Sequence, residues 1–98
     1  VNMKKYYIMA VKHGNKKAMY DLGYYYEFIE KDYRKMKIYY MLGIQKNCKK
    51  SLERLDYYYY ETSKNYIEYY RLLTRTNIKS KIVLQKIDEL TKMRRTLV

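Results

Sequence analysis

The dominant feature of this 98-residue chain is an internal repeat. When the sequence is shifted by 33 residues, Met3–Tyr26 aligns with Met36–Tyr59 without a gap, and ten of the 24 positions are identical. A period of about 30 to 50 residues built from two helices is typical of stacked helical repeats, in which each helix pair covers the apolar face of its neighbour. The sequence therefore predicts an all-α protein: an α-solenoid of antiparallel helix pairs with about six helices.

Within each repeat, apolar residues recur with the period of a helix rather than that of a strand. Pro is absent and Gly occurs only three times, which also favours helix. We expect helices near 3–14, 16–29, 33–46, 49–62, 64–76 and 78–96. The expected buried face of the first helix of each repeat holds Ala18, Leu22, Tyr25 or Tyr26, and Ile29, with a copy at Ser51, Leu55, Tyr58 or Tyr59, and Thr62. That of the second helix holds Met36, Tyr39 or Tyr40, and Gly43, with copies at Met3, Tyr6 or Tyr7, and Ala10 and at Tyr66, Tyr69 or Tyr70, and Leu73. The last helix is expected to bury Ser80, Leu84, Ile87 and Thr91, with Leu90 and Leu97 alongside.

Turn signals separate these segments. The stretches HGN at 13–15, KN at 46–47 and TN at 76–77 put Gly or Asn where a helix ends in a left-handed conformation. Asp32 and Ser63 are placed to cap the helices that follow them. The predicted organisation is one helical-repeat domain over 1–98, with a partial repeat 3–14, repeats 16–46 and 49–76, and a capping helix 78–96. Because the chain begins with Val1, we expect it to be a fragment of a longer repeat protein.

Charge and hydropathy narrow the functional classes. The net charge is +12, with 22 Lys and Arg against 10 Asp and Glu, so polyanions are attracted without specificity. The longest apolar runs are far shorter than the roughly 18 to 20 residues that a membrane span requires. The single cysteine, Cys48, cannot form an internal disulfide, which fits a reducing compartment, so we expect an intracellular protein.

The motif YYIMAVKHGNKKAMYDLGYYYE resembles the Sel1-like repeat, a relative of the tetratricopeptide repeat. Tyr7, Ala10, Val11, Gly14, Asn15, Ala18, Leu22, Gly23 and Tyr26 occupy the positions of the family pattern. In the second copy Lys46 and Asp56 replace the two glycines, and the Gly-rich turn usual between the helices is missing. The Tyr- and Lys-rich composition is similar to variants from large DNA viruses, which implies the cytoplasm of an infected host cell. The resemblance implies an adaptor that holds other proteins rather than an enzyme.

Candidate chemistry is sparse. His13 lies in a predicted turn without a paired acid, and Cys48 follows the equivalent turn one repeat later, too far away for shared metal ligation. We therefore expect neither catalysis nor a metal or other cofactor.

The candidate binding residues lie on the face of each first helix that is opposite the predicted core. Aromatic and Lys side chains on the concave side of a superhelix suit a partner peptide or protein. Basic residues interleaved with aromatics also suit single-stranded nucleic acid, so weak binding of a polyanion stays as the alternative. The predicted partner-binding residues are Lys17, Tyr20, Tyr24, Lys50, Glu53 and Tyr57, next to Phe28 and Tyr60.

Overall fold

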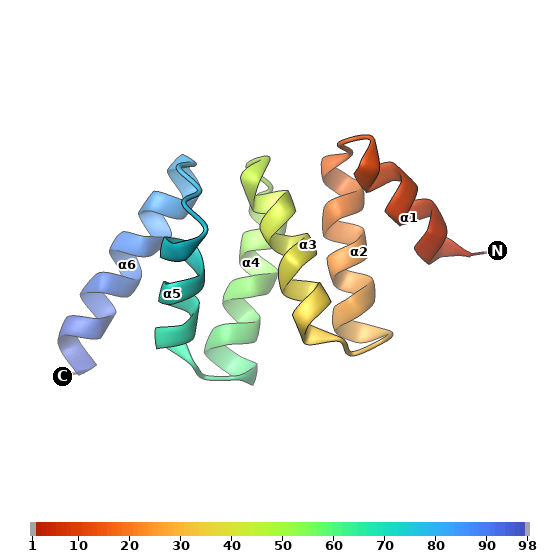
Figure 1. Cartoon of the computed structure of the whole chain (residues 1–98). Coiled ribbons are helices and arrows are strands. Elements are labelled where there is room, and N and C mark those ends of the chain that lie inside the picture. Colours follow the sequence, from red (N-terminus) through yellow and green to blue (C-terminus); the bar gives the residue numbers. More distant parts are fainter. Residues whose placement is uncertain (1, 98) are drawn as a thin grey trace. The chain divides into compact units, whose positions relative to one another are not determined.

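The computed structural model describes residues 2–97, with side chains over 2–93. Six α-helices and one short π-helical segment account for nearly all of this part of the chain, which contains no strand, so the all-α prediction is confirmed (Figure 1). The elements are α1 Met3–Lys12, α2 Lys16–Phe28, α3 Tyr33–Gln45, α4 Lys49–Tyr57, the π-helical segment η1 Tyr58–Thr62, α5 Tyr66–Arg75 and α6 Lys81–Leu97.

The turns between helices follow the predicted chemistry. Gly14, Asn47 and Asn77 all have left-handed backbone angles, with φ of 79°, 62° and 55°, as the turn signals predicted. Asp32 caps α3 by accepting a hydrogen bond from the backbone N–H of Lys35. The prediction for Ser63 was wrong: α5 begins two residues later and its cap is Asn65, because π-helical turns extend the preceding helix as far as Thr62.

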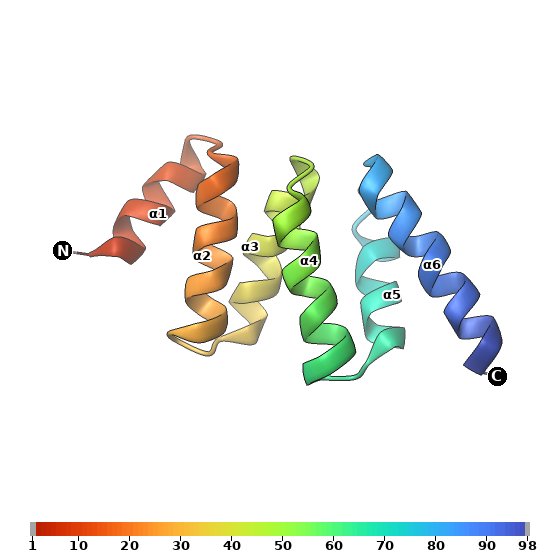
Figure 2. The ribbon, with the colours of Figure 1, turned by 180° about the vertical axis from the view of Figure 1, so that it is seen from behind.

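The chain divides into two compact units, Val1–Leu55 and Asp56–Val98. In the first unit successive helices run in opposite directions, and the α1–α2 and α3–α4 turns lie at the same end (Figures 1 and 2). Its core contains most of the expected face residues of α2, α3 and α4, and also Ile44, which was not among them. Those with least exposure are Leu22, Met36, Tyr40, Ile44, Ser51 and Leu55.

Close helix approach in the first unit depends on small residues. A Cβ at Gly43 would lie 2.5 Å from Oγ of Ser51, so α3 and α4 pack here only because position 43 has no side chain. The Ser51 hydroxyl is itself buried and has no hydrogen-bond partner among the described residues. This contact explains why the repeat keeps small residues on both helices.

The core of the second unit is built from α5, α6 and η1. Tyr59, Tyr69, Leu73, Val83 and Leu90 are buried. The ring of Tyr59 stacks on that of Tyr69, with centroids 4.6 Å apart and planes 12° from parallel. Aromatic stacking therefore supplies much of the contact between η1 and α5.

Several predicted core positions are exposed. Leu84 is 54% exposed and Val83 is buried instead, because the face of α6 that packs on α5 contains Val83 and Leu90. Ile29 and Thr62 lie at helix ends, where the chain turns away from the core. On α1, Met3 and Tyr6 are exposed because they lie away from the side of this helix that packs on α2. The side chain of Leu97 lies outside the described residues.

Among the described helices, none is long and apolar enough to span a bilayer.

Candidate functional site

The structure places the six predicted site residues on two helices. Lys17, Tyr20 and Tyr24 lie on α2, whereas Lys50, Glu53 and Tyr57 lie on α4. All except Tyr20 are exposed, and Tyr20 is half-buried. Tyr57 belongs to the second compact unit and is not part of the site described below, whereas Tyr20 and Tyr24 lie at its centre.

Three aromatic side chains in consecutive turns of α2 form a continuous row. Tyr20, Tyr24 and Phe28 are spaced four residues apart, which puts them on one helix face. Ring centroids are 6.1 Å apart between Tyr20 and Tyr24 and 4.5 Å apart between Tyr24 and Phe28. Tyr24 is 45% exposed and Phe28 43%. We call Tyr20, Tyr24 and Phe28 the aromatic ladder.

Both ends of the aromatic ladder are held by other helices. The ring of Tyr20 lies 6.0 Å from that of Tyr40 on α3, and burial raises the pKa of Tyr20 above its ordinary value. At the other end, the guanidinium carbon of Arg54 on α4 lies 4.9 Å from the centroid of Phe28. The rings are thus fixed in place before any partner binds, which lowers the entropy cost of binding.

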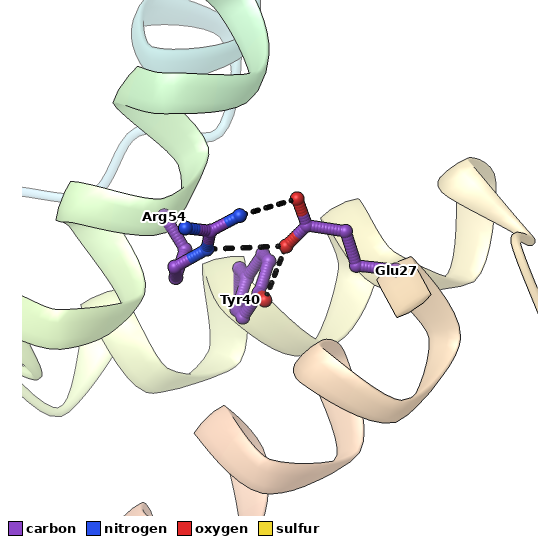
Figure 3. Close-up of polar contacts among 3 residues, drawn as sticks. All are labelled: Glu27, Tyr40 and Arg54. Atoms are coloured by element: carbon purple, nitrogen blue, oxygen red, sulfur yellow. Dashed lines mark hydrogen bonds and ion pairs between the residues drawn. The ribbon is translucent and has the colours of Figure 1, made fainter. Parts of the chain in front are cut away.

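A buried carboxylate connects these supports. Glu27 on α2 is only 7% exposed, and its Oε1 accepts a 2.7 Å hydrogen bond from the hydroxyl of Tyr40 (Figure 3). Arg54 donates to both carboxylate oxygens, from Nη2 to Oε2 at 2.8 Å and from Nε to Oε1 at 3.3 Å. We call Glu27, Tyr40 and Arg54 the first clamp, and it joins α2, α3 and α4.

In the first clamp, the buried Glu27 carboxylate is compensated by hydrogen bonds and by a positive charge. Burial and then the hydrogen bond to Glu27 raise the pKa of Tyr40 far above that of a free tyrosine, so the phenol stays protonated. The hydrogen bond to Glu27 raises the pKa of Arg54. With a charged partner and two kinds of donor, the buried carboxylate is compensated.

Gly23 provides the space for this arrangement. A Cβ at this position would lie 2.5 Å from Cδ1 of Tyr40. The Tyr40 ring is completely buried and cannot move aside freely. Gly23, which matches a glycine of the Sel1-like pattern, is therefore needed to leave room for the Tyr40 ring. The hydroxyl of that ring reaches Glu27, one turn further along α2.

The second unit contains a clamp of the same construction. Asp56 at the end of α4 accepts a hydrogen bond from the hydroxyl of Tyr69 on α5 and forms a 2.9 Å ion pair with Lys86 on α6. Lys86 also pairs with Glu89 at 2.8 Å and lies 5.7 Å from the ring centroid of Tyr60. We call Asp56, Tyr69 and Lys86 the second clamp.

The pKa shifts of the second clamp have the same sign as those of the first. Burial, and then the charge of Asp56, raise the pKa of the Tyr69 phenol far above its ordinary value. Burial alone lowers the pKa of Lys86, but hydrogen bonds to Glu89 and Asp56 outweigh it and raise the net value. Both clamps therefore join a carboxylate, a protonated tyrosine of the next helix and a cation of the helix after that.

The clamps were missed at the level of sequence. Asp56 was noted only as a replacement for the glycine of the pattern, whereas the structure shows that it meets the Tyr69 hydroxyl directly. The available signal was the charged residue at the edge of an apolar helix face: Glu27 directly follows the buried Tyr26, and Asp56 directly follows Leu55. This signal was not specific, because Glu53 directly follows the buried Leu52 and is nevertheless exposed.

Other reactive side chains do not gather around the aromatic ladder. His13 is exposed in the α1–α2 turn, and Cys48 is buried before α4. No group of three or more His, Cys, Asp or Glu within the described part of the chain could hold a metal ion. The chemistry that this face offers is contact through aromatic rings and charged side chains.

Comparisons with protein-family models, with curated proteins and with solved structures gave no match. The resemblance to the Sel1-like repeat therefore stays a prediction.

Proposed function

We propose that this protein is a non-catalytic adaptor that binds a partner peptide or protein through the aromatic ladder. The observation that carries the proposal is a row of aromatic side chains that is both exposed and held rigid. Aromatic residues dominate the binding energy of protein interfaces when they are pre-positioned around a central contact. Here Tyr24 and Phe28 are accessible while Tyr40 and Arg54 fix the ends of the row.

The arrangement of the rings favours a peptide over a nucleic acid. Bases bind single-stranded platforms by stacking on free ring faces. In the aromatic ladder each ring has an aromatic or guanidinium neighbour on both sides: Tyr24 lies between Tyr20 and Phe28, and Phe28 lies between Tyr24 and Arg54. A base that stacked on these rings would have to compete with those contacts, whereas the apolar side chains of a peptide can pack against the exposed parts of Tyr24 and Phe28 without displacing them.

The two clamps support the further proposal that the chain is a helical-repeat protein of the Sel1-like kind. In each unit a carboxylate, a tyrosine and a cation come from three successive helices. A connection that recurs from one helix group to the next is what a stacked solenoid requires, because each layer depends on its neighbour. An extended solenoid would present first helices such as α2 along one surface, where an adaptor binds its partner.

The proposal is tested with peptides selected from a displayed random library against the wild-type protein. We expect Tyr24→Ser to weaken the selected peptides by about 30-fold or more, since truncation of an aromatic anchor costs about 2 kcal/mol or more. The matched control is Tyr6→Ser, which removes an exposed tyrosine of α1 outside the ladder and should leave affinity unchanged. Equal losses in both variants, or no enriched peptide at all, would contradict the proposal.

A nucleic-acid function predicts the opposite pattern. Binding of single-stranded oligothymidylate would fall steeply between about 50 and 200 mM salt and would be weakened more by replacing Lys16, Lys17, Lys49 and Lys50 than by Tyr24→Ser. Tyr20 is left intact in these experiments because its ring packs on Tyr40, so its removal would also disturb folding. Tyr57→Ser tests separately whether the predicted site residue of the second unit contributes.

A further inference from the structure

Six lysines without ionic partners gather at one end of the first unit. Three belong to the α1–α2 turn and its flanks, and three to the α3–α4 turn, and these turns lie at the same end of the helices (Figures 1 and 2). Each is exposed, and none forms an ion pair within the described part of the chain. We call this set the lysine rim: Lys12, Lys16, Lys17, Lys46, Lys49 and Lys50.

The opposite end of the same unit is built differently. There Lys4 pairs with Glu30 at 2.8 Å, and Lys35 lies 4.0 Å from Asp32. Residues 12–17 and 46–50 contain no acidic residue. The nearest carboxylates along α2 and α4, those of Asp21 and Glu53, lie about one turn beyond the rim. The opposite end also holds Lys5, Lys31 and Arg34, so the rim differs from it in having no acidic residue among its lysines rather than in the number of basic residues.

The position of four of these lysines opposes helix stability. Lys16 and Lys17 occupy the first turn of α2, Lys49 and Lys50 occupy the first turn of α4, and neither turn contains an acidic residue. The helix dipole favours negative charge at this end and disfavours positive charge. Both pairs recur at equivalent positions of the repeat. Residues that break a local stability rule at equivalent positions are expected at functional surfaces.

The lysine rim borders the aromatic ladder. Lys17 precedes Tyr20 by three residues and Tyr24 by seven, so all three lie on one face of α2. On α4, Lys50 lies one turn before Arg54, which covers Phe28. A chain that binds along the ladder toward the start of α2 therefore meets the lysines directly.

We propose that the lysine rim binds an acidic segment of the partner, a run of Asp or Glu next to the apolar side chains that bind the aromatic ladder. This inference rests on the proposed peptide-binding function and names the chemistry of the partner. Complementary charge raises the rate of encounter and selects among partners. An acidic peptide fits better than a nucleic acid because the adjacent rings already contact one another and Arg54, so a stacking base would compete with these contacts.

The test uses two synthetic peptides that share an apolar segment rich in Leu and Trp, preceded by a run of Glu in one and by Gln in the other. Binding to the full chain is measured by fluorescence anisotropy at about 50 and 200 mM salt. We expect the Glu peptide to bind about tenfold or more tightly than the Gln peptide at low salt, and this difference to shrink at higher salt.

Two quadruple variants with equal charge change locate the effect. The rim variant replaces Lys16, Lys17, Lys49 and Lys50 with Gln, and the control replaces Lys5, Lys31, Lys79 and Lys81. We expect the rim variant alone to remove the preference for Glu over Gln. Its melting temperature should stay the same or rise, because positive charge is removed from two helix N-termini.

The outcomes separate the two proposals. If both peptides bind through Tyr24 but equally well, or if the control variant lowers the preference as much as the rim variant, the acidic-partner inference is wrong and the ladder function stands. If neither peptide depends on Tyr24, the proposed function fails and this inference fails with it. If oligothymidylate displaces the Glu peptide and binds the Tyr24→Ser variant unchanged, the rim is a nucleic-acid site and the inference is overturned.

Discussion

Replacing Arg54 with Met should break the first clamp and lower the free energy of unfolding substantially. Methionine keeps much of the aliphatic bulk but removes both hydrogen bonds to Glu27. The Glu27 carboxylate is 7% exposed, and among the described residues it would keep only the Tyr40 hydroxyl as a hydrogen-bond partner. Removing one member of a buried ion pair costs about 3 to 5 kcal/mol. The side chain of Arg54 is 25% exposed, so solvent screens part of the loss and the lower end applies. Loss of the Arg54 contact with Phe28 adds about 0.5 kcal/mol.

The expected total is about 3 to 4 kcal/mol, a substantial share of the roughly 5 to 15 kcal/mol that stabilises a small domain. Urea unfolding followed by circular dichroism should show a fall in midpoint of about 2 M or more, with a slope of about 1 to 1.5 kcal/mol per M. The matched control is Lys92→Met, which breaks an exposed pair with Asp88 and should cost less than about 0.5 kcal/mol.

A double variant isolates the cause. Glu27→Gln in the Arg54→Met background removes the uncompensated charge while an amide oxygen can still accept from Tyr40. It should recover about 2 kcal/mol relative to Arg54→Met alone. If Arg54→Met is no more destabilising than Lys92→Met, or if the double variant recovers nothing, then the first clamp does not stabilise the unit in the way described here.

Two further predictions concern the tyrosines of the clamps. Gly23→Ala should destabilise the protein by about 1 to 3 kcal/mol in spite of the better helix propensity of Ala, because the added Cβ meets the Tyr40 ring. In a Tyr40→Ala background the same change should be neutral or stabilising. Thermal melts of the wild type, the two single variants and the double variant test this prediction. Because the folded state raises the pKa of Tyr40 and of Tyr69, the unfolded chain loses these protons first, so stability should be complete below about pH 10 and fall above it by about 1.4 kcal/mol per pH unit for each tyrosine. Urea midpoints between pH 9 and 11 should fall less steeply for Tyr40→Phe than for the wild type, whereas Tyr6→Phe, which removes an exposed hydroxyl, should change nothing; parallel profiles in all three proteins would refute the assigned protonation.

The exposure of most candidate site residues could be predicted from the sequence, but the contacts that hold the aromatic ladder in place could not. The exposure of Lys17, Tyr24 and Lys50 follows from the helical period once the buried face of each helix is known. Tyr20 was predicted on the same surface and is half-buried, because the ring of Tyr40 from the next helix reaches it. The spacing of residues within α2 cannot reveal this contact, because the contact depends on how α3 packs against α2.

The sequence by itself determined the helices and the turns of this protein, because both depend on interactions within a few residues. Helical period, the caps at Asn15 and Asp32, and the left-handed Gly14, Asn47 and Asn77 are all local features. Only the tertiary structure decided that Glu27 meets Arg54 and that Asp56 meets Lys86, because each pair joins residues from different helices that approach only after packing. It also decided that α6 buries Val83 rather than Leu84, since a rotation of about 100° per residue exchanges the face that contacts α5.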